Sequence, residues 1–178
     1  MIILASKSPR RKELLSFITT DFVIKTADVD ETLEEGISPK EAVEYLSRIK
    51  AEPFADNVNT IIGADTVVAI GNRILGKPMN REDAFHMLRL LSGNTHSVFT
   101  GVTVISPDRT ETFSVETKVK FFTLSDDEIN DYLDTDEPYD KAGAYGIQGK
   151  GALLVESIEG DYFNVVGLPV STLNKFLK

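Results

Sequence analysis

The sequence predicts an α/β fold, with a mixed or largely parallel sheet flanked by helices. Strand and helix signals alternate along its 178 residues, which is the pattern of proteins in which helices cover a sheet. The clearest strand is the apolar run of residues 60–70, and the clearest helix is residues 39–50, where apolar residues recur at helical spacing. A chain of this length buries roughly 70% of its unfolded surface. We therefore expect a single domain, residues 1–178, with two lobes around one cleft.

In the first part of the chain, two helices are predicted from their caps. Met1–Ala5 is a short apolar strand, and Ser8 followed by Pro9 is a typical helix start, so a helix is expected from there to about Ile18. A capping box that begins at Ser38 opens the second helix. The other expected elements are a strand at 22–24, an acidic loop at 28–36 and a strand at 60–70.

The rest of the chain continues this alternation. Asn80 is expected to cap a helix that ends at Gly93, and a capping box at Ser125 opens another helix. The remaining expected elements are strands at 97–105, 113–124 and 153–158 and a terminal helix from about residue 168.

The composition excludes several classes of protein. The net charge is −9, so we expect no nucleic-acid partner, because proteins that bind nucleic acid usually present a basic face. The absence of cysteine excludes disulfides and thiolate metal sites, and the two histidines lack the paired spacing of zinc ligands. No apolar run reaches the ~20 residues that span a bilayer, and the first residues do not resemble a signal peptide. We expect a cytoplasmic protein with no membrane partner.

Four cations lie close together near the amino terminus of this acidic chain. Lys7, Arg10, Arg11 and Lys12 stand where the first strand is expected to turn into the first helix, and no acid lies among or before them. Backbone N–H groups, the Ser8 hydroxyl and guanidinium groups in such a position can bind a phosphate. The alternative is a set of solvated surface charges. We favour a small anionic ligand, because a long polyanion would be repelled by most of this surface.

Two acidic positions are candidates for chemistry. Asp65 lies within the apolar run 60–70, where an isolated charge would be costly, so it should be paired, bind a metal or face a cleft. It would act as a base toward water or hold a divalent cation that activates water. Glu31, in the acidic loop, is the candidate for a second Mg²⁺ ligand. The alternative for Asp65 is an aspartate at a strand end that caps a neighbouring loop. The alternative for Glu31 is that the whole acidic loop is solvated and has no chemical role.

A glycine-rich segment lies late in the chain. Residues 143–151 contain four glycines, which suits a loop that takes positive φ or lies against a ligand. Gln148 within it could read a nucleobase, because its amide both donates and accepts. The spacing fits neither a P-loop nor a dinucleotide-binding fingerprint. Lys50, Lys77 and Lys141 are candidates for phosphate binding, although each by itself is more simply explained as a surface lysine.

Five segments, in order along nearly the whole chain, resemble the Maf family of nucleoside triphosphate pyrophosphatases. They are Ala5–Arg11, Gly63–Thr66, Gly76–Pro78, Glu137–Gly149 and Asp161–Pro169. Any one of them would be a modest indication, but five in the same order make a chance similarity very improbable.

The resemblance implies an activity, a fold and a cofactor. Family members cleave a nucleoside triphosphate between the α and β phosphates, with Mg²⁺ or Mn²⁺, and release the monophosphate and pyrophosphate as a house-cleaning activity. Their fold is an elongated mixed sheet with flanking helices and a central cleft, similar to inosine triphosphate pyrophosphatases. A homodimer is also implied. The family is linked to inhibition of septum formation, a role in cell-division arrest that none of these residues indicates.

The resemblance also implies roles for individual residues. Asp65 takes the proton-acceptor position, while Arg10, Thr66 and Gln148 take the positions tied to base choice in the dTTP/UTP branch, which also includes modified pyrimidine nucleotides. Another branch prefers 7-methyl-GTP and differs at such positions. The resemblance and the candidate residues named above together give one expected site. Its substrate-binding residues are Ser8, Arg10, Arg11, Lys50, Thr66, Lys77, Lys141 and Gln148, and its metal ligands are Glu31 and Asp65.

Two other functions would use the same charges. A nucleotide-binding regulator of septum formation would bind the triphosphate without significant turnover. A phosphotransferase would need an acceptor site, and the sequence shows no obvious one.

Overall fold

The computed structural model describes all residues, 1–178, and contains one seven-stranded mixed sheet. The strand order is β2-β1-β3-β5-β6-β7, and β4 pairs with β3 off this path. The strands are β1 (Ile2–Ala5), β2 (Phe22–Ile24), β3 (Thr60–Ile70), β4 (Arg73–Leu75), β5 (Thr95–Ile105), β6 (Thr110–Phe121) and β7 (Val155–Glu159). Strand β1 is parallel to both β2 and β3, whereas β3–β4 and β6–β7 are antiparallel. The expected α/β class with a mixed sheet is confirmed.

The chain divides into two compact units. Unit 1 comprises residues 1–66, 99–115 and 163–178, and unit 2 comprises residues 67–98 and 116–162. Strands β3, β5 and β6 therefore contribute residues to both units. The arrangement of two lobes around one cleft stays a prediction.

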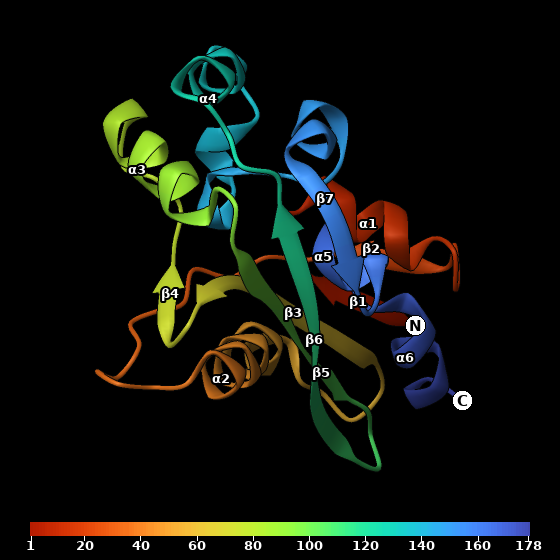
Figure 1. Ribbon diagram of the computed structural model, residues 1–178. Helices are drawn as coiled ribbons and strands as arrows, with labels where there is room; N and C mark the ends of the chain where they lie inside the picture. The colour runs from red at the N-terminus through yellow and green to blue at the C-terminus, as the bar shows by residue number, and fades with distance from the viewer. The chain divides into compact units, whose positions relative to one another are not determined.

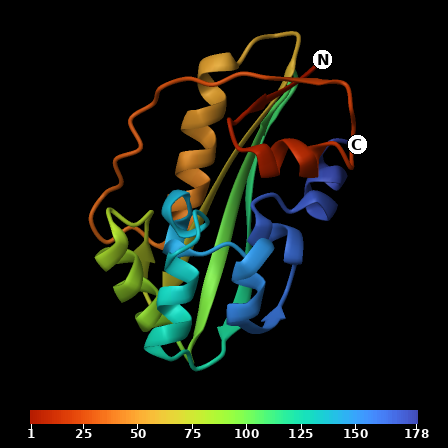
Figure 2. The same ribbon diagram turned by 90° about the horizontal axis from the view of Figure 1, so that it is seen from above.

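In unit 1, the order of the first three strands creates a switch in chain direction. Helix α1 (Pro9–Leu15) connects β1 to β2, and α2 (Pro39–Ala51) leads from β2 to β3 on the other side of β1. Figure 2 shows α2 on one side of these strands and α1 on the other. In parallel sheets, ligands bind beyond the carboxyl ends of the strands at such a switch. A ligand site is therefore expected beyond the carboxyl end of β1 and beside the adjoining part of β3.

Glycines allow α2 to lie very close to the sheet. A Cβ atom on Gly63 of β3 would stand 2.2 Å from the Ser47 carbonyl oxygen, and one on Gly101 of β5 would stand 2.2 Å from the Val43 carbonyl oxygen. The Ser47 hydroxyl also lies 2.9 Å from the Thr103 hydroxyl. Because α2 rests directly on the strands, its last turn lies at a defined position relative to β3.

In unit 2, α3 (Arg81–Leu91) packs against α4 (Asp126–Leu133), as Figure 1 shows. Both helices begin at the predicted caps, Asn80 and Ser125, whose side chains accept hydrogen bonds from backbone N–H groups of the first turn. An ion pair joins Arg89 to Asp126, between the two helices. Leu88 and Leu91 of α3 and Ile129 and Leu133 of α4 are all buried.

The glycine-rich segment folds as a series of short 3₁₀ turns: η2 (Pro138–Asp140), η3 (Ala142–Ala144) and η4 (Gly149–Leu154). Gly143 and Ala144 have φ of 72° and 61°. A positive φ is uncommon for alanine and signals local strain, which often accompanies functional loops. The prediction of positive φ in this loop is confirmed.

Several element limits differ from the prediction. Helix α1 ends at Leu15 rather than near Ile18, because the amides of residues 17 and 18 turn to i−3 carbonyls. The terminal helix expected from about residue 168 is α6 (Val170–Phe176), and a separate short helix, α5 (Tyr162–Val166), precedes it, with Gly167 at φ 133° between them. Neither β4 nor α5 was expected from the sequence. None of the helices has the length and apolar character needed to cross a membrane.

Candidate active site

Asp65 lies on β3 just beyond the end of β1, at the switch in unit 1. The last residue pair between these strands is Ala5 with Gly63, so Asp65 extends past it. The Lys50 ammonium, at the end of α2, forms an ion pair with Asp65 Oδ1 and lies 3.1 Å from Glu31 Oε2. Asp65 is only 8% exposed, and a buried carboxylate without a partner would be strongly destabilising. Asp65 is therefore paired, as expected, and its partner Lys50 is itself one of the expected substrate-binding residues.

This cluster can accommodate a divalent cation. Two carboxylates, from Asp65 and Glu31, converge on one positively charged group. No group of three or more acidic, histidine or cysteine side chains is placed to hold a metal ion. Mg²⁺ needs only one or two protein carboxylates when phosphate oxygens and water complete its shell. The donor set therefore fits a metal that binds together with a phosphate ligand.

Arg11, in the first turn of α1, is held by three protein acceptors. Its Nε donates to the Gly167 carbonyl at 2.9 Å, Nη1 to Ser6 Oγ at 3.4 Å and Nη2 to Thr66 Oγ1 at 3.0 Å. Burial lowers the pKa of Arg11 from its ordinary value, and the nearby Asp65 opposes this shift. Arg11 thus joins α1, β3 and the turn before α6. The sequence predicts phosphate binding for Arg11 but not these contacts with the protein itself.

Thr66, which follows Asp65 on β3, belongs to a polarised chain of hydrogen bonds. The Thr100 hydroxyl donates to the Asn164 carbonyl at 2.9 Å and lies 2.9 Å from the Thr66 hydroxyl. Because the Thr100 hydroxyl already donates its proton to the Asn164 carbonyl, Thr66 must be the donor in the bond between the two hydroxyls. Thr66 Oγ1 also accepts a hydrogen bond from Arg11. The Thr66 hydroxyl is left with one lone pair, so it can only accept a hydrogen bond from a ligand. Thr100 was missed because a threonine within a strand carries no sequence signal of this role.

Unlike Arg11, Arg10 and Ser8 keep hydrogen-bond donors that no group of the protein uses. Ser8 Oγ accepts a long hydrogen bond, 3.5 Å, from the Arg11 backbone N–H, which leaves the hydroxyl proton of Ser8 uncommitted. No hydrogen bond or ion pair holds the half-buried Arg10 guanidinium. Because α1 has only seven residues, side chains rather than a long helix dipole supply the donors here.

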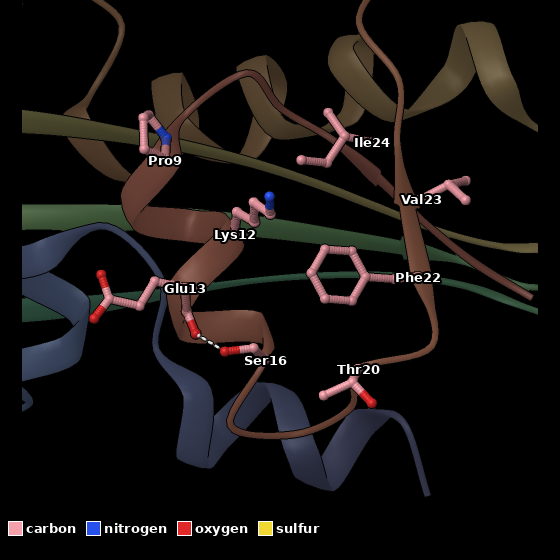
Figure 3. Close-up of a pocket in the computed structure, with 8 residues that line it drawn as sticks. All are labelled: Pro9, Lys12, Glu13, Ser16, Thr20, Phe22, Val23 and Ile24. Atoms are coloured by element: carbon pink, nitrogen blue, oxygen red, sulfur yellow. Dashed lines mark hydrogen bonds between the residues drawn. The ribbon is translucent and has the colours of Figure 1, made fainter.

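A hollow of about 590 Å³ lies on unit 1 between α1 and β2. Figure 3 shows α1 on one side of it and Phe22, Val23 and Ile24 of β2 on the other. Its charged residues are Lys12 and Glu13, which have opposite signs. None of the predicted substrate-binding or metal residues lines it, so we do not assign the nucleotide to this hollow.

Unit 2 holds the other predicted residues, Lys77, Lys141 and Gln148. The Gly143 N–H donates to the Gly76 carbonyl at 3.1 Å, which ties the loop of Lys77 to the glycine-rich segment. Lys141 Nζ donates to the Glu137 carbonyl and to Asp140, each at 2.8 Å. The side chains of Lys77 and Gln148 are exposed. These three residues are therefore carried by two loops that are bonded to each other.

The structure also contains a contact that the sequence did not reveal. The Glu137 carboxylate accepts hydrogen bonds from the backbone N–H groups of Lys150 and Gly151, at 2.8 and 3.1 Å. Its signal in the sequence was an acid placed shortly before a loop rich in glycine, whose N–H groups need acceptors.

Known proteins resemble this chain over nearly its whole length. The Maf-like protein family matches residues 1–178. A dTTP/UTP pyrophosphatase of Geobacillus sp. (strain WCH70) is 54% identical over 172 residues, covering 96% of this chain and 92% of the relative. Proteins of the same name from Bacillus velezensis and Bacillus pumilus are 51% and 50% identical, each covering 99% of this chain and 95% of the relative.

Among solved structures, the Staphylococcus aureus Ham1 protein has a similar fold. The TM-score is 0.56 with 17% sequence identity, and the alignment covers 99% of this chain and 97% of that one. This likeness supports the expected fold class. Together, the five motifs, the match of the family over residues 1–178 and the identity to these relatives show that the chain belongs to the Maf family.

Proposed function

We propose that this protein hydrolyses dTTP and UTP between the α and β phosphates and releases the nucleoside monophosphate and pyrophosphate. Relatives 50 to 54% identical to it carry the name dTTP/UTP pyrophosphatase. The structural observation that carries the proposal is the buried Asp65 beyond the end of β1, which pairs with Lys50, whose ammonium also contacts Glu31. A carboxylate held in place beside a cation is suited to act on water near a phosphate.

Asp65 is proposed as the proton acceptor. Lys50 contacts its Oδ1, so Oδ2 can take a proton from the attacking water. The water oxygen forms a bond to the α phosphorus while the bond from that phosphorus to the bridging oxygen breaks, and pyrophosphate leaves with that oxygen. The Lys50 ammonium keeps Asp65 oriented and adds positive charge beside the reacting phosphate.

The remaining cations and hydroxyls are proposed to bind the phosphates. Arg10 has an unengaged guanidinium and Ser8 an uncommitted hydroxyl proton, and both are donors to phosphate oxygens. Lys77 and Lys141 stay predicted phosphate-binding residues. Arg11 is also proposed to bind phosphate. Because its guanidinium already donates to three protein acceptors, its main role is to hold Ser6 and Thr66 in position.

Asp65 and Glu31 would hold a divalent cation, Mg²⁺ or Mn²⁺, which offsets the negative charge that develops on the phosphate during attack. The Lys50 ammonium, which now neutralises both carboxylates, would have to shift toward a phosphate oxygen when the cation binds. That shift agrees with its assignment as a substrate-binding residue.

Base selection is assigned to Arg10, Thr66 and Gln148, as the family resemblance implies. Thr66 can only accept a hydrogen bond, whereas the Gln148 amide both donates and accepts. The homodimer and the cytoplasmic location stay predictions.

A panel of nucleoside triphosphates with product identification tests the proposal. Pyrophosphate and the monophosphate should form from dTTP and UTP when Mg²⁺ or Mn²⁺ is present. Orthophosphate as the product, or a preference for purines, would contradict the reaction or its specificity. Tight dTTP binding without pyrophosphate release under all metal conditions would instead identify a nucleotide-binding regulator, and labelled phosphate on a second substrate would identify a phosphotransferase.

A further inference from the structure

One carboxylate holds the carboxyl-terminal end of the segment Gly146–Gly151 in unit 2. Glu137 Oε1 accepts from the Lys150 N–H at 2.8 Å, and Oε2 accepts from the Gly151 N–H at 3.1 Å. Each carboxylate oxygen thus takes one backbone donor. These charge-assisted hydrogen bonds are stronger than neutral ones, and the pKa of Glu137 is lowered in spite of burial because these donors stabilise the ionised form.

The same carboxylate reaches the amino-terminal end of the segment through Tyr132. The Tyr132 hydroxyl accepts from the Gly146 N–H at 3.2 Å, and it lies close enough to the Glu137 carboxylate for each group to shift the pKa of the other. Since an ionised carboxylate can only accept, the tyrosine O–H is the donor side of this interaction. Burial raises the pKa of Tyr132 above its ordinary value, so the hydroxyl keeps its proton.

Two glycines leave the space that these contacts require. A Cβ on Gly149, where φ is 66°, would lie 2.5 Å from Glu137 Oε1. A Cβ on Gly151 would lie 1.8 Å from the Gly146 carbonyl oxygen. Only glycine allows the carboxylate to come so close to the backbone and lets the two ends of the segment meet.

Gln148 lies midway between the two held ends, and its side chain is exposed. Its own side chain caps no helix, so it is available to a ligand. Both flanking peptides are restrained by Glu137, one directly and one through Tyr132. The direction in which Gln148 projects therefore depends on a residue 11 positions earlier in the sequence.

We propose that Glu137 is a positioning residue for base recognition, which clamps both ends of the segment Gly146–Gly151 and so fixes the side chain of Gln148. This inference rests on the proposed function, in which Gln148 contacts the pyrimidine base. Glu137 itself does not touch the substrate. Its removal should weaken nucleotide binding and selectivity while Asp65 and its partners stay intact.

The test uses Glu137→Gln in the full-length protein, with Asp136→Asn as the matched control. The glutamine keeps the size of the side chain but places an NH₂ donor against one backbone donor, so one hydrogen bond is lost. Asp136→Asn removes the same charge from an exposed neighbour outside the hydrogen bonds described above. Hydrogen exchange of the Lys150 and Gly151 amides should become at least about tenfold faster in Glu137→Gln and stay unchanged in the control.

Kinetics supply the second readout. In Glu137→Gln, KM for dTTP should rise about tenfold and the preference for dTTP over purine triphosphates should fall, with kcat within about threefold of the parent value. Tyr132→Phe releases only the Gly146 end and should give a smaller change in the same direction. Because the two variants share one carboxylate, the double variant should lose less than the sum of the single losses.

Unchanged exchange at Lys150 and Gly151 in Glu137→Gln would overturn the clamp. Faster exchange with unchanged KM and unchanged base preference would overturn the link to Gln148. If the parent protein releases no pyrophosphate, the proposed function fails, and the dissociation constant for dTTP then replaces KM in the same comparison. Should Glu137→Gln fail to fold, Tyr132→Phe tests the Gly146 end alone: unchanged exchange at Gly146, or faster exchange with unchanged KM and base preference, would overturn the proposal there.

Discussion

Asp65 and Thr66 are consecutive residues of β3, yet they serve opposite faces of the sheet. Asp65 pairs with Lys50 of α2, whereas Thr66 accepts a hydrogen bond from Arg11 of α1, and Figure 2 shows these helices on the two sides of the strands. Alternation along a strand requires this separation. Beyond the end of β1, strand β3 thus presents a carboxylate to α2 on one face of the sheet and a hydroxyl to α1 on the other.

Replacement of Asp65 by asparagine should reduce kcat for pyrophosphate release from dTTP by about two orders of magnitude or more, because the proton acceptor is lost. The fold should be retained, since asparagine has nearly the same volume and Lys50 keeps its contact with Glu31. Steady-state kinetics and a thermal melt measure the two effects. Asp108→Asn, in an exposed turn, is the control, and a rate near that of the parent in Asp65→Asn would refute the assignment.

Arg10 and Arg11 should respond differently to replacement by lysine. Arg11→Lys loses the planar group that bonds Gly167, Ser6 and Thr66, so the free energy of unfolding should fall by about 1–3 kcal/mol. Arg10→Lys should change that free energy by less than about 0.5 kcal/mol but raise KM for dTTP. Urea unfolding and kinetics on both variants separate the roles. Equal losses of stability would show that the division between the two arginines is wrong.

His96 should make the protein less stable as the pH falls from about 6.5 to about 4. This histidine is 2% exposed, and burial lowers its pKa to about 4 from the ordinary value of 6.5. Below pH 6.5 the unfolded chain therefore binds a proton at His96 that the folded chain does not, and up to roughly 3 kcal/mol of stability is lost.

Urea unfolding across this pH range, compared between the parent and His96→Gln, isolates the contribution of His96. Glutamine can still bond the Tyr145 hydroxyl, which lies 2.6 Å from His96 Nε2, and it does not titrate. His86→Gln, at an exposed histidine, should keep the pH dependence of the parent. If His96→Gln and the parent show the same slope, the histidine is not neutral in the folded protein.

Gly63→Ala should destabilise the protein by about 1–3 kcal/mol or more. Its Cβ would lie 2.2 Å from the Ser47 carbonyl oxygen and 2.9 Å from Ala51 Cβ, so α2 would have to move. Because Lys50 lies in the last turn of α2, activity should fall as well. Gly76→Ala is the control, since nothing lies within 4 Å of its Cβ; a similar loss in both variants would contradict the packing explanation.

Local patterns in the sequence predicted most of the helices and strands. The bounds of β3 are residues 60 and 70 as expected, and the capping boxes at Ser38 and Ser125 are formed. These features depend on residues within about four positions of one another, so they can be recognised without the fold. The short elements β4 and α5 were missed because segments of three and five residues are stabilised by tertiary contacts rather than by their own pattern.

For the site, the sequence by itself determined the kinds of group that are present: a carboxylate in an apolar strand, a cluster of cations and an amide in a loop of glycines. Only the tertiary structure decided their partners. Lys50 pairs with Asp65 across 15 positions, and Arg11 reaches Gly167 across 156. Periodicity tells which face of an element a residue occupies, but the residue that meets it depends on how distant segments are brought together, and no local pattern carries that information.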